Sequence, residues 1–227
     1  MTDRKKKWLK FSMVFPVFLL DLLLGPGVIL IMKAMGLTVY SAAKADENYL
    51  ATFLQNLMLF LYPLLLAGAM AVILKKDFFR EMGLTVKGML PWVWTLLLVG
   101  CLLFFGLTIS ERSHQSELTF YNLMYFVVFV GLSEEFVYRG VCPWLLKEFP
   151  WEIRYLLPAA LFALAHVFAF THFAIPDGQQ LMRFFTSEFP SLMAAGCCFQ
   201  LLRDRTGTLW IPILLHALID FAPMLHI

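Results

Sequence analysis

The amino-acid sequence predicts an all-α fold: a polytopic membrane helix bundle of about seven transmembrane helices, with its N-terminus in the cytoplasm. Composition is the first observation behind this prediction, since 60% of the 227 residues are hydrophobic and 15% are charged. Soluble domains average about 45–50% apolar and about 25% charged residues. The mean hydropathy is +0.75. The other two observations are long apolar stretches and basic residues concentrated in alternate loops.

Seven stretches are apolar enough to be transmembrane helices, which need about 20 mostly apolar residues. The basic start of the chain resembles a signal peptide. However, the apolar segment behind it is longer than a signal core and lacks a small-residue cleavage site, so a retained span is predicted. Glu188 and Pro190 interrupt the sixth stretch, which favours a short or broken helix there. The predicted spans are residues 11–32, 51–74, 90–109, 120–146, 155–173, 184–202 and 208–225.

Lysine and arginine residues predict the direction of the bundle, because cytoplasmic loops carry an excess of them. The N-terminal segment and the second, fourth and sixth loops together hold thirteen, whereas the intervening loops hold four. This alternation places the N-terminus in the cytoplasm and the C-terminus outside. The remaining basic residue, Arg139, lies within a predicted span.

The chain, residues 1–227, is predicted to be a single integral membrane domain, because no internal repeat is evident and the loops are too short for a soluble domain. The compact chain and short loops favour a prokaryotic inner (plasma) membrane. The four cysteines lie in apolar stretches without a CxxC pair. They are therefore predicted to be small buried hydrophobes, not a disulfide framework or a zinc site.

Few ionisable residues lie within the predicted spans, where such residues usually face a bundle interior or a water-filled cavity. At a helical rise of about 1.5 Å per residue, Glu134, His166, His216 and Asp220 lie roughly 12–20 Å from the cytoplasmic ends of spans four, five and seven. Polar groups of three helices thus reach a similar depth, which indicates a functional site reachable from the cytoplasm. The ionisable residues within the spans are Asp21, Glu134, Glu135, Arg139, His166, His216 and Asp220.

Helix geometry sorts these residues, because positions four apart share a face and adjacent positions lie about 100° apart. Glu135 and Arg139 are therefore predicted to pair on one face of span four. Glu134 points elsewhere, alongside Tyr138, and is predicted to face His166 of span five. The histidine and aspartate of span seven are also four residues apart, so the aspartate could orient the imidazole or contact the substrate.

A structural role is the alternative for each of these residues taken alone. A Glu–Arg pair can hold two helices together, and a buried histidine can be a hydrogen-bonded core residue. The convergence of two carboxylates, two histidines and an arginine at one depth favours a functional site. Asp21 stands apart from this set, shortly before Gly25-Pro26-Gly27, and is predicted to be structural or water-facing.

Three motifs occur in order, each within a separate span: EEFVYR at residues 134–139, FALAH at 162–166 and HALID at 216–220. This order resembles the EExxxR, FxxxH and HxxxN/D motifs of the CAAX-processing and bacteriocin-processing (CPBP) family of intramembrane proteases. The resemblance covers about residues 120–225, which is therefore the expected catalytic core. Spans one to three resemble the family only in being apolar.

The resemblance implies that Glu134 and His166 activate a water molecule for attack on a peptide carbonyl. It also implies that His216 and Asp220 form the oxyanion-stabilising side. Asp220 departs from the family pattern, in which asparagine often fills this position. An asparagine donates a hydrogen bond to an oxyanion, whereas an ionised aspartate would repel it. Either Asp220 is protonated in its apolar surroundings, or it orients or charges His216.

Glu135 and Arg139 are implied to be the supporting pair. A glutamate mechanism without metal is favoured, because the sequence contains no HExxH motif and a carboxylate with an imidazole can activate water. The alternative is zinc bound by Glu134, His166 and His216. No cofactor is therefore expected, with zinc as the alternative.

The expected function is hydrolysis of a peptide bond in a membrane-associated protein or peptide precursor, with the lipid bilayer as the other partner and no nucleic acid. Eukaryotic relatives cleave prenylated CAAX termini, but nothing in the sequence indicates a lipidated substrate. One alternative is a non-catalytic membrane scaffold or bacteriocin-immunity protein on the same fold, which would not need every catalytic position. A proton-relay transporter is disfavoured, because neither an inverted repeat nor paired broken helices are evident.

Overall fold

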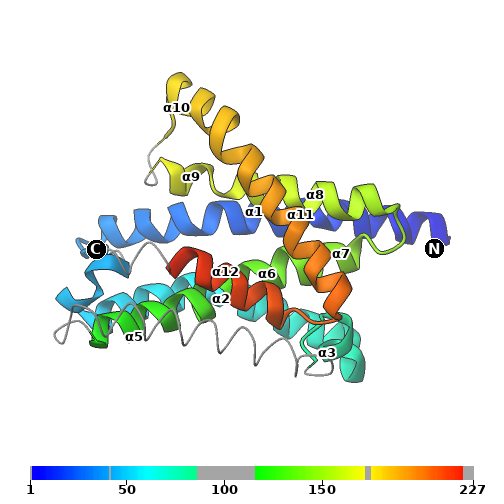
Figure 1. The fold of residues 1–227 in the computed structure, drawn as a ribbon, viewed down its shortest axis with the longest axis horizontal. Coiled ribbons are helices and arrows are strands. Elements are labelled where there is room, and N and C mark those ends of the chain that lie inside the picture. The colour runs from blue at the N-terminus through cyan, green and yellow to red at the C-terminus, as the bar shows by residue number, and fades with distance from the viewer. Residues whose placement is uncertain (1, 41, 86–115, 172–174, 222–227) are drawn as a thin grey trace.

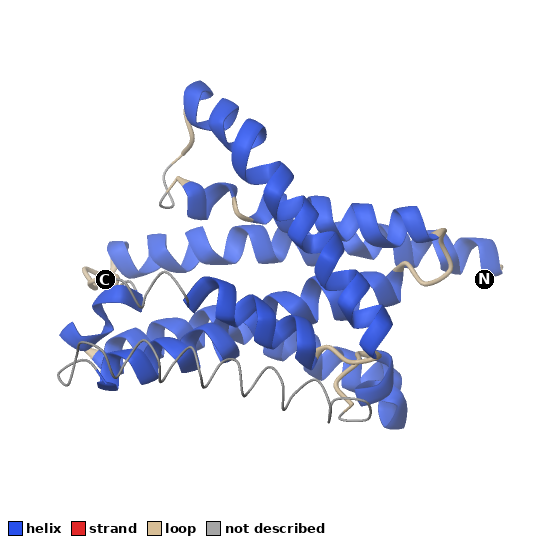
Figure 2. Ribbon diagram, viewed as in Figure 1, coloured by secondary structure: helices blue, strands red, loops and turns tan. Residues whose placement is uncertain are grey.

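A computed structural model describes residues 2–40, 42–85, 116–171 and 175–221 of the chain. These residues form helices joined by short loops and contain no strand (Figure 2). The all-α prediction is therefore confirmed for the described ranges. The third predicted span, residues 90–109, lies outside them.

Four helical segments in the described ranges are long and apolar enough to cross a membrane. They contain nearly all of predicted spans one, two, four and five. Predicted span seven corresponds to α12 (Trp210–Phe221), a shorter apolar helix, and the sixth is not among the four. The described part of the chain thus supports four spans, against the seven predicted. The four segments are Asp3–Ala34, Tyr49–Glu81, Glu117–Leu145 and Trp151–Phe170.

The first two long helices pack against each other. The Asn48 side chain caps the second of them by accepting a hydrogen bond from the Ala51 N–H. The Tyr62 hydroxyl joins the two helices by donating to the Val17 carbonyl at 2.6 Å. Both helices contain interior prolines. The elements of this half are α1 (Asp3–Ala34), η1 (Ala42–Glu47), α2 (Tyr49–Leu74), η2 (Lys75–Asp77) and α3 (Phe78–Glu81).

Span four alternates between α-helical and π-helical turns. Its two π-helical parts flank the short element that carries both central glutamates. A π-helix bonds residue i to i+5 and so has wider turns, which occur often at functional sites. Helix α12 packs along the first π-helical part. The elements are α5 (Ser116–Met124), η3 (Tyr125–Leu132), α6 (Ser133–Glu135), η4 (Phe136–Val141) and α7 (Cys142–Leu145).

The predicted break near Glu188 and Pro190 takes the form of a π-helical turn inside a continuous helix. The turn ends at Glu188, and Pro190 is the second residue of α11, where the missing proline N–H is tolerated as at a helix start. Gly207, with φ of 70°, ends this long helix, which crosses the preceding one (Figure 1). The elements are α8 (Trp151–Ala165), α9 (Val167–Phe170), α10 (Gly178–Arg183), η5 (Phe184–Glu188) and α11 (Phe189–Thr206).

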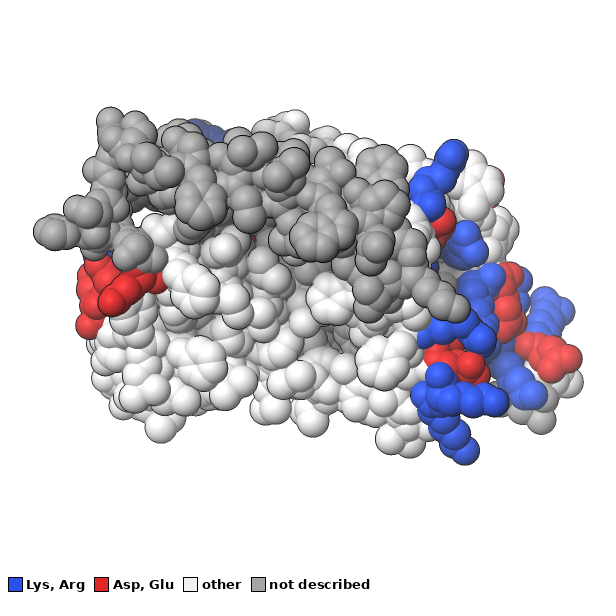
Figure 3. Space-filling view, turned by 60° about the horizontal axis from the view of Figure 1, so that its bottom comes forward, with Lys and Arg blue, Asp and Glu red and all other residues white. Residues whose placement is uncertain are grey.

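On the face seen in Figure 3, charged side chains gather at the two ends of the long axis, and the described surface between them is apolar. At the end where α1 begins, Lys and Arg side chains mix with acidic ones. The Lys10 ammonium donates to Glu148 at 2.7 Å, and this hydrogen bond lowers the pKa of that carboxyl group. Such a distribution is that of a protein embedded in a bilayer.

Two of the three described cysteines depart from the prediction that cysteines are buried. Cys142 lies in the core, but Cys198 is exposed and Cys197 is intermediate. Both belong to α11. None of the three is in a disulfide.

Substitution of Gly196 by alanine is expected to lower the free energy of unfolding by about 1–3 kcal/mol, the usual effect of overpacking. Gly196 brings α11 close to α8, and a Cβ there would lie 3.0 Å from the Ala159 Cβ and 3.2 Å from Arg139 Nη2. Gly68→Ala in α2 is the matched control, because nothing lies within 4 Å of its added Cβ. Thermal unfolding in detergent would measure both, and equal midpoints would contradict the close contact.

Candidate active site

Glu134 lies between two imidazole rings that come from different helices. Its Oε2 is 3.7 Å from Nε2 of His166, which follows α8, and 3.8 Å from Nε2 of His216 on α12. This oxygen is buried and has no hydrogen-bond partner in the described part of the chain. The distances exceed those of direct hydrogen bonds and suit groups joined through a shared water molecule.

The opposite nitrogen of each ring is already engaged. Nδ1 of His166 lies 2.8 Å from the Phe162 carbonyl oxygen, and Nδ1 of His216 lies 2.8 Å from Oε1 of Glu135. A carbonyl oxygen can only accept, so Nδ1 of His166 is the donor. In the neutral ring this leaves the His166 Nε2 lone pair directed toward Glu134. The FxxxH spacing thus fixes both the tautomer and the orientation of the ring.

Glu135 and Arg139 form the ion pair that their spacing predicts. Arg139 Nη1 lies 3.0 Å from Glu135 Oε1, and both side chains are buried. The guanidinium centre stands 4.1 Å from the Phe162 ring centroid and 5.3 Å from that of Phe199, at cation–π distance. The charges of Glu135 and Arg139 therefore compensate each other, and aromatic rings cover the guanidinium group.

Glu135 connects this ion pair to His216. The same oxygen, Oε1, contacts both Arg139 and the imidazole. The Phe199 ring stacks on His216 with centroids 5.3 Å apart. Asp220, one turn further along α12, places Oδ2 3.4 Å from His216 Nε2. Carboxylates therefore lie near both nitrogens of this imidazole.

A cavity of about 210 Å³ opens beside Glu134. Its walls come from α1, α2, span four and the end of α8, and they include Asp21, Tyr138 and His166. The buried Tyr138 hydroxyl donates to Asp21 Oδ2 at 2.6 Å. Asp21 was predicted to stand apart from the other ionisable residues of the spans. It nevertheless lines the same cavity as Glu134.

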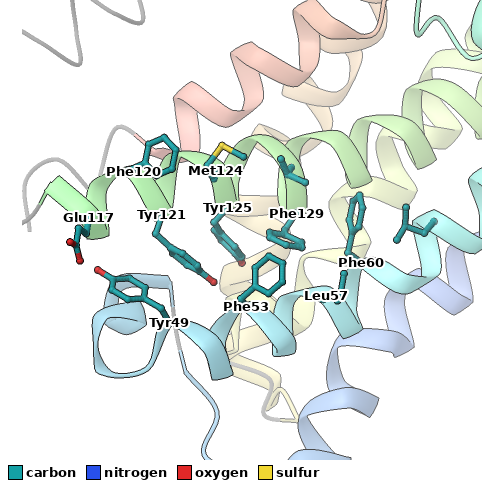
Figure 4. A pocket seen from close by; sticks show the side chains of 12 residues that line it. Tyr49, Phe53, Leu57, Phe60, Glu117, Phe120, Tyr121, Met124, Tyr125 and Phe129 are labelled. Carbon is teal, nitrogen blue, oxygen red and sulfur yellow. The ribbon is translucent and has the colours of Figure 1, made fainter.

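A second cavity, of about 750 Å³, lies between α2 and span four (Figure 4). Apolar and aromatic side chains dominate its lining, and Glu117 lies at one end of it. Tyr125 and Phe129 line both cavities. The smaller cavity is the candidate active site, because it holds the carboxylate and the imidazole that can exchange protons.

The residues that would bind zinc do face one another, since Glu134 Oε2 is within 3.8 Å of both Nε2 atoms. Among the described residues, no group of three or more His, Cys, Asp or Glu side chains is arranged to hold a metal ion. Donor atoms of a tetrahedral site with ligand bonds of about 2.0–2.2 Å lie roughly 3.4 Å apart. The separations of 3.7 and 3.8 Å are slightly longer than this.

The six residues singled out in the sequence come together from three parts of the chain. Glu134, Glu135 and Arg139 lie on span four, His166 follows α8, and the other two lie on α12. The two glutamates were predicted to have different partners, but both carboxylates lie within 3.8 Å of His216. Sequence reasoning missed the contact between Asp21 and Tyr138 and the aromatic cover of Arg139. The lone aspartate in span one was the only signal of the former.

Residues 116–222 match the family model described as type II CAAX prenyl endopeptidase Rce1-like. The match includes all three motifs and begins with α5. No curated protein and no solved structure matches the chain.

Proposed function

Because residues 116–222 match the type II CAAX prenyl endopeptidase Rce1-like family model, we propose that the chain is a member of this family and that it hydrolyses peptide bonds with water activated by Glu134 and His166. The family is one of membrane proteases, and its substrates are membrane-associated proteins. The observation that carries the mechanism is the buried Oε2 of Glu134, which has an imidazole Nε2 on either side.

Two acceptors that face each other at 3.7 Å are best joined by a molecule that donates to both. A water molecule does so with its two hydrogens, one toward Glu134 and one toward the lone pair of His166 Nε2. Transfer of one proton to Glu134 leaves the water oxygen free to attack the carbonyl carbon of the substrate. Glu134 then returns this proton to the leaving amine as the C–N bond breaks.

His216 is the donor in this proposal. Glu135, ionised beside Arg139, accepts from Nδ1. Asp220, 3.4 Å from Nε2, favours a proton on that nitrogen as well. The Nε2–H can then donate to the oxyanion that develops on the substrate carbonyl. Of the two alternatives for Asp220, this geometry favours the one in which it orients and charges His216.

The basic residues at the end where α1 begins favour a cytoplasmic N-terminus, by the positive-inside rule. The site would then be reached from the cytoplasmic side of a plasma membrane. The substrate class proposed is a membrane-associated protein or peptide precursor, lipidated or not.

The proposal is tested by cleavage in liposomes that contain the purified protein. A proteome-derived peptide mixture is added in water enriched in ¹⁸O, and new C-termini are identified by mass spectrometry. Hydrolysis is expected to place ¹⁸O in each new carboxyl group, and His166→Ala is expected to abolish the new termini. A scaffold or immunity protein would yield none with either protein.

Chelating agents are expected to leave the rate of cleavage unchanged, because Glu134 and His166 activate water without a metal in this mechanism. The rate is measured before and after incubation with 1,10-phenanthroline, with an unrelated zinc protease as the positive control. Loss of activity that added zinc restores would instead favour zinc held by Glu134, His166 and His216.

A further inference from the structure

One wall of the cavity beside Glu134 combines apolar side chains of α1 and α2 with the carboxylate of Asp21. Asp21 of α1 lines this wall and accepts from Tyr138 through one carboxylate oxygen, Oδ2. Within the described residues, Asp21 forms no ion pair with a lysine, arginine or histidine side chain, whereas Glu135 has Arg139. A carboxylate within a span normally has a cationic partner.

Two prolines add backbone acceptors to the same wall. Pro26 lies inside α1 and Pro63 inside α2, and both line the cavity. A proline has no N–H, so the carbonyl four residues earlier loses its helical hydrogen bond. These carbonyls belong to Leu22 and Leu59, which line the cavity as well. Two helices therefore carry, among the residues that line this cavity, carbonyls that lack their usual helical donor.

We propose that this wall is a subsite for a cationic side chain of the substrate, lysine or arginine, close to the scissile bond, and that Asp21 determines this specificity. The inference rests on the proposed proteolytic function. An ammonium has three N–H donors and a guanidinium five, with no acceptor. They complement a wall that offers a carboxylate and two carbonyls.

The size of the cavity fits such a group. Its volume of about 210 Å³ corresponds to roughly seven water molecules at about 30 Å³ each. An extended side chain of several heavy atoms can therefore reach Asp21 while its backbone stays near Glu134. Tyr138 holds the carboxylate in place, because its ring packs edge-to-face on Phe162 at 5.5 Å.

The test compares two peptides with wild-type protein, Asp21→Asn and the control Asp46→Asn, which changes an exposed aspartate. One is a peptide from the mixture that the wild-type protein cleaves, with lysine or arginine within three residues of the cut. The other carries norleucine there. The ratio of kcat/KM for the basic over the neutral peptide is expected to be roughly 30-fold or more in the wild type. It is expected to fall to about one in Asp21→Asn and to persist in Asp46→Asn.

The neutral peptide separates recognition from shape, because Asp21→Asn is expected to lower kcat/KM much more for the basic peptide than for the neutral one, whereas Asp46→Asn should keep the wild-type values for both. Equal loss for both peptides would mean that Asp21 maintains the shape of the cavity, and the subsite would be rejected. The absence of any basic preference in an active wild type would also reject it, while leaving the proteolytic function intact. A wild type that cleaves no peptide would reject both.

Discussion

Replacement of Glu134 by glutamine is expected to lower the rate of cleavage by about 10²–10⁴-fold, the usual contribution of a general base. Glutamine keeps the size and the hydrogen-bonding oxygen of the side chain but cannot take a proton from water. The buried Oε2 that faces both imidazoles is the atom whose basicity is lost. Single-turnover cleavage in liposomes measures the chemical step directly.

Glu117→Gln is the matched control, since it makes the same change at an exposed residue at the N-terminal end of the same span. It should cleave at the wild-type rate. Binding of substrate to Glu134→Gln should persist, so KM is expected to change much less than kcat. Retention of full activity by Glu134→Gln would assign the general base to another residue.

Hydropathy predicts where the long helices of this fold lie, but it does not predict the hydrogen-bonding pattern within them. Apolar composition predicts the spans at residues 11–32, 51–74, 120–146 and 155–173, because burial in lipid requires it. The first helix nevertheless begins at Asp3, since the basic residues before the apolar run are helical too. The π-helical turns of span four leave no signal in hydropathy, because they change hydrogen-bonding register and not composition.

The site was predictable where its contacts are local in the sequence. Glu135 and Arg139 are four residues apart, and helix geometry alone predicts their pairing. The hydrogen bond between Glu135 and His216 joins residues on different spans. To predict this bond, one would need to know how α12 is rotated about its own axis. That rotation depends on how closely α12 approaches span four, and Gly131 permits a close approach.

Asp21 shows the limit of reasoning from depth alone. Its position in span one puts it at a depth like that of the other ionisable groups, but depth does not say which helices are neighbours. Helix α1 packs against α2, α7 and α8, and this packing brings Asp21 to Tyr138. An isolated aspartate in an apolar span is thus better assigned to a cavity than to lipid.

Replacement of Arg139 by methionine is expected to reduce the free energy of unfolding by about 3–5 kcal/mol, because it removes the guanidinium partner of a buried carboxylate and leaves His216 as its only partner among the described residues. Glu135 and Arg139 are both buried, with N and O atoms 3.0 Å apart. Methionine has a similar length and is apolar, so most of the effect is electrostatic. Chemical unfolding in detergent micelles measures it, with Arg80→Met, at an exposed ion pair, as the control.

The double variant Glu135→Gln/Arg139→Met separates stability from function. It contains no uncompensated charge, so it is expected to recover most of the stability lost in Arg139→Met. Glutamine can still accept from His216 Nδ1, but it is neutral and no longer favours an imidazolium there. Cleavage should therefore remain well below that of the wild type in a protein that unfolds at nearly the same denaturant concentration. Full activity in this stable double variant would mean that the pair serves the fold alone, whereas low activity would place its charge in the chemistry of His216.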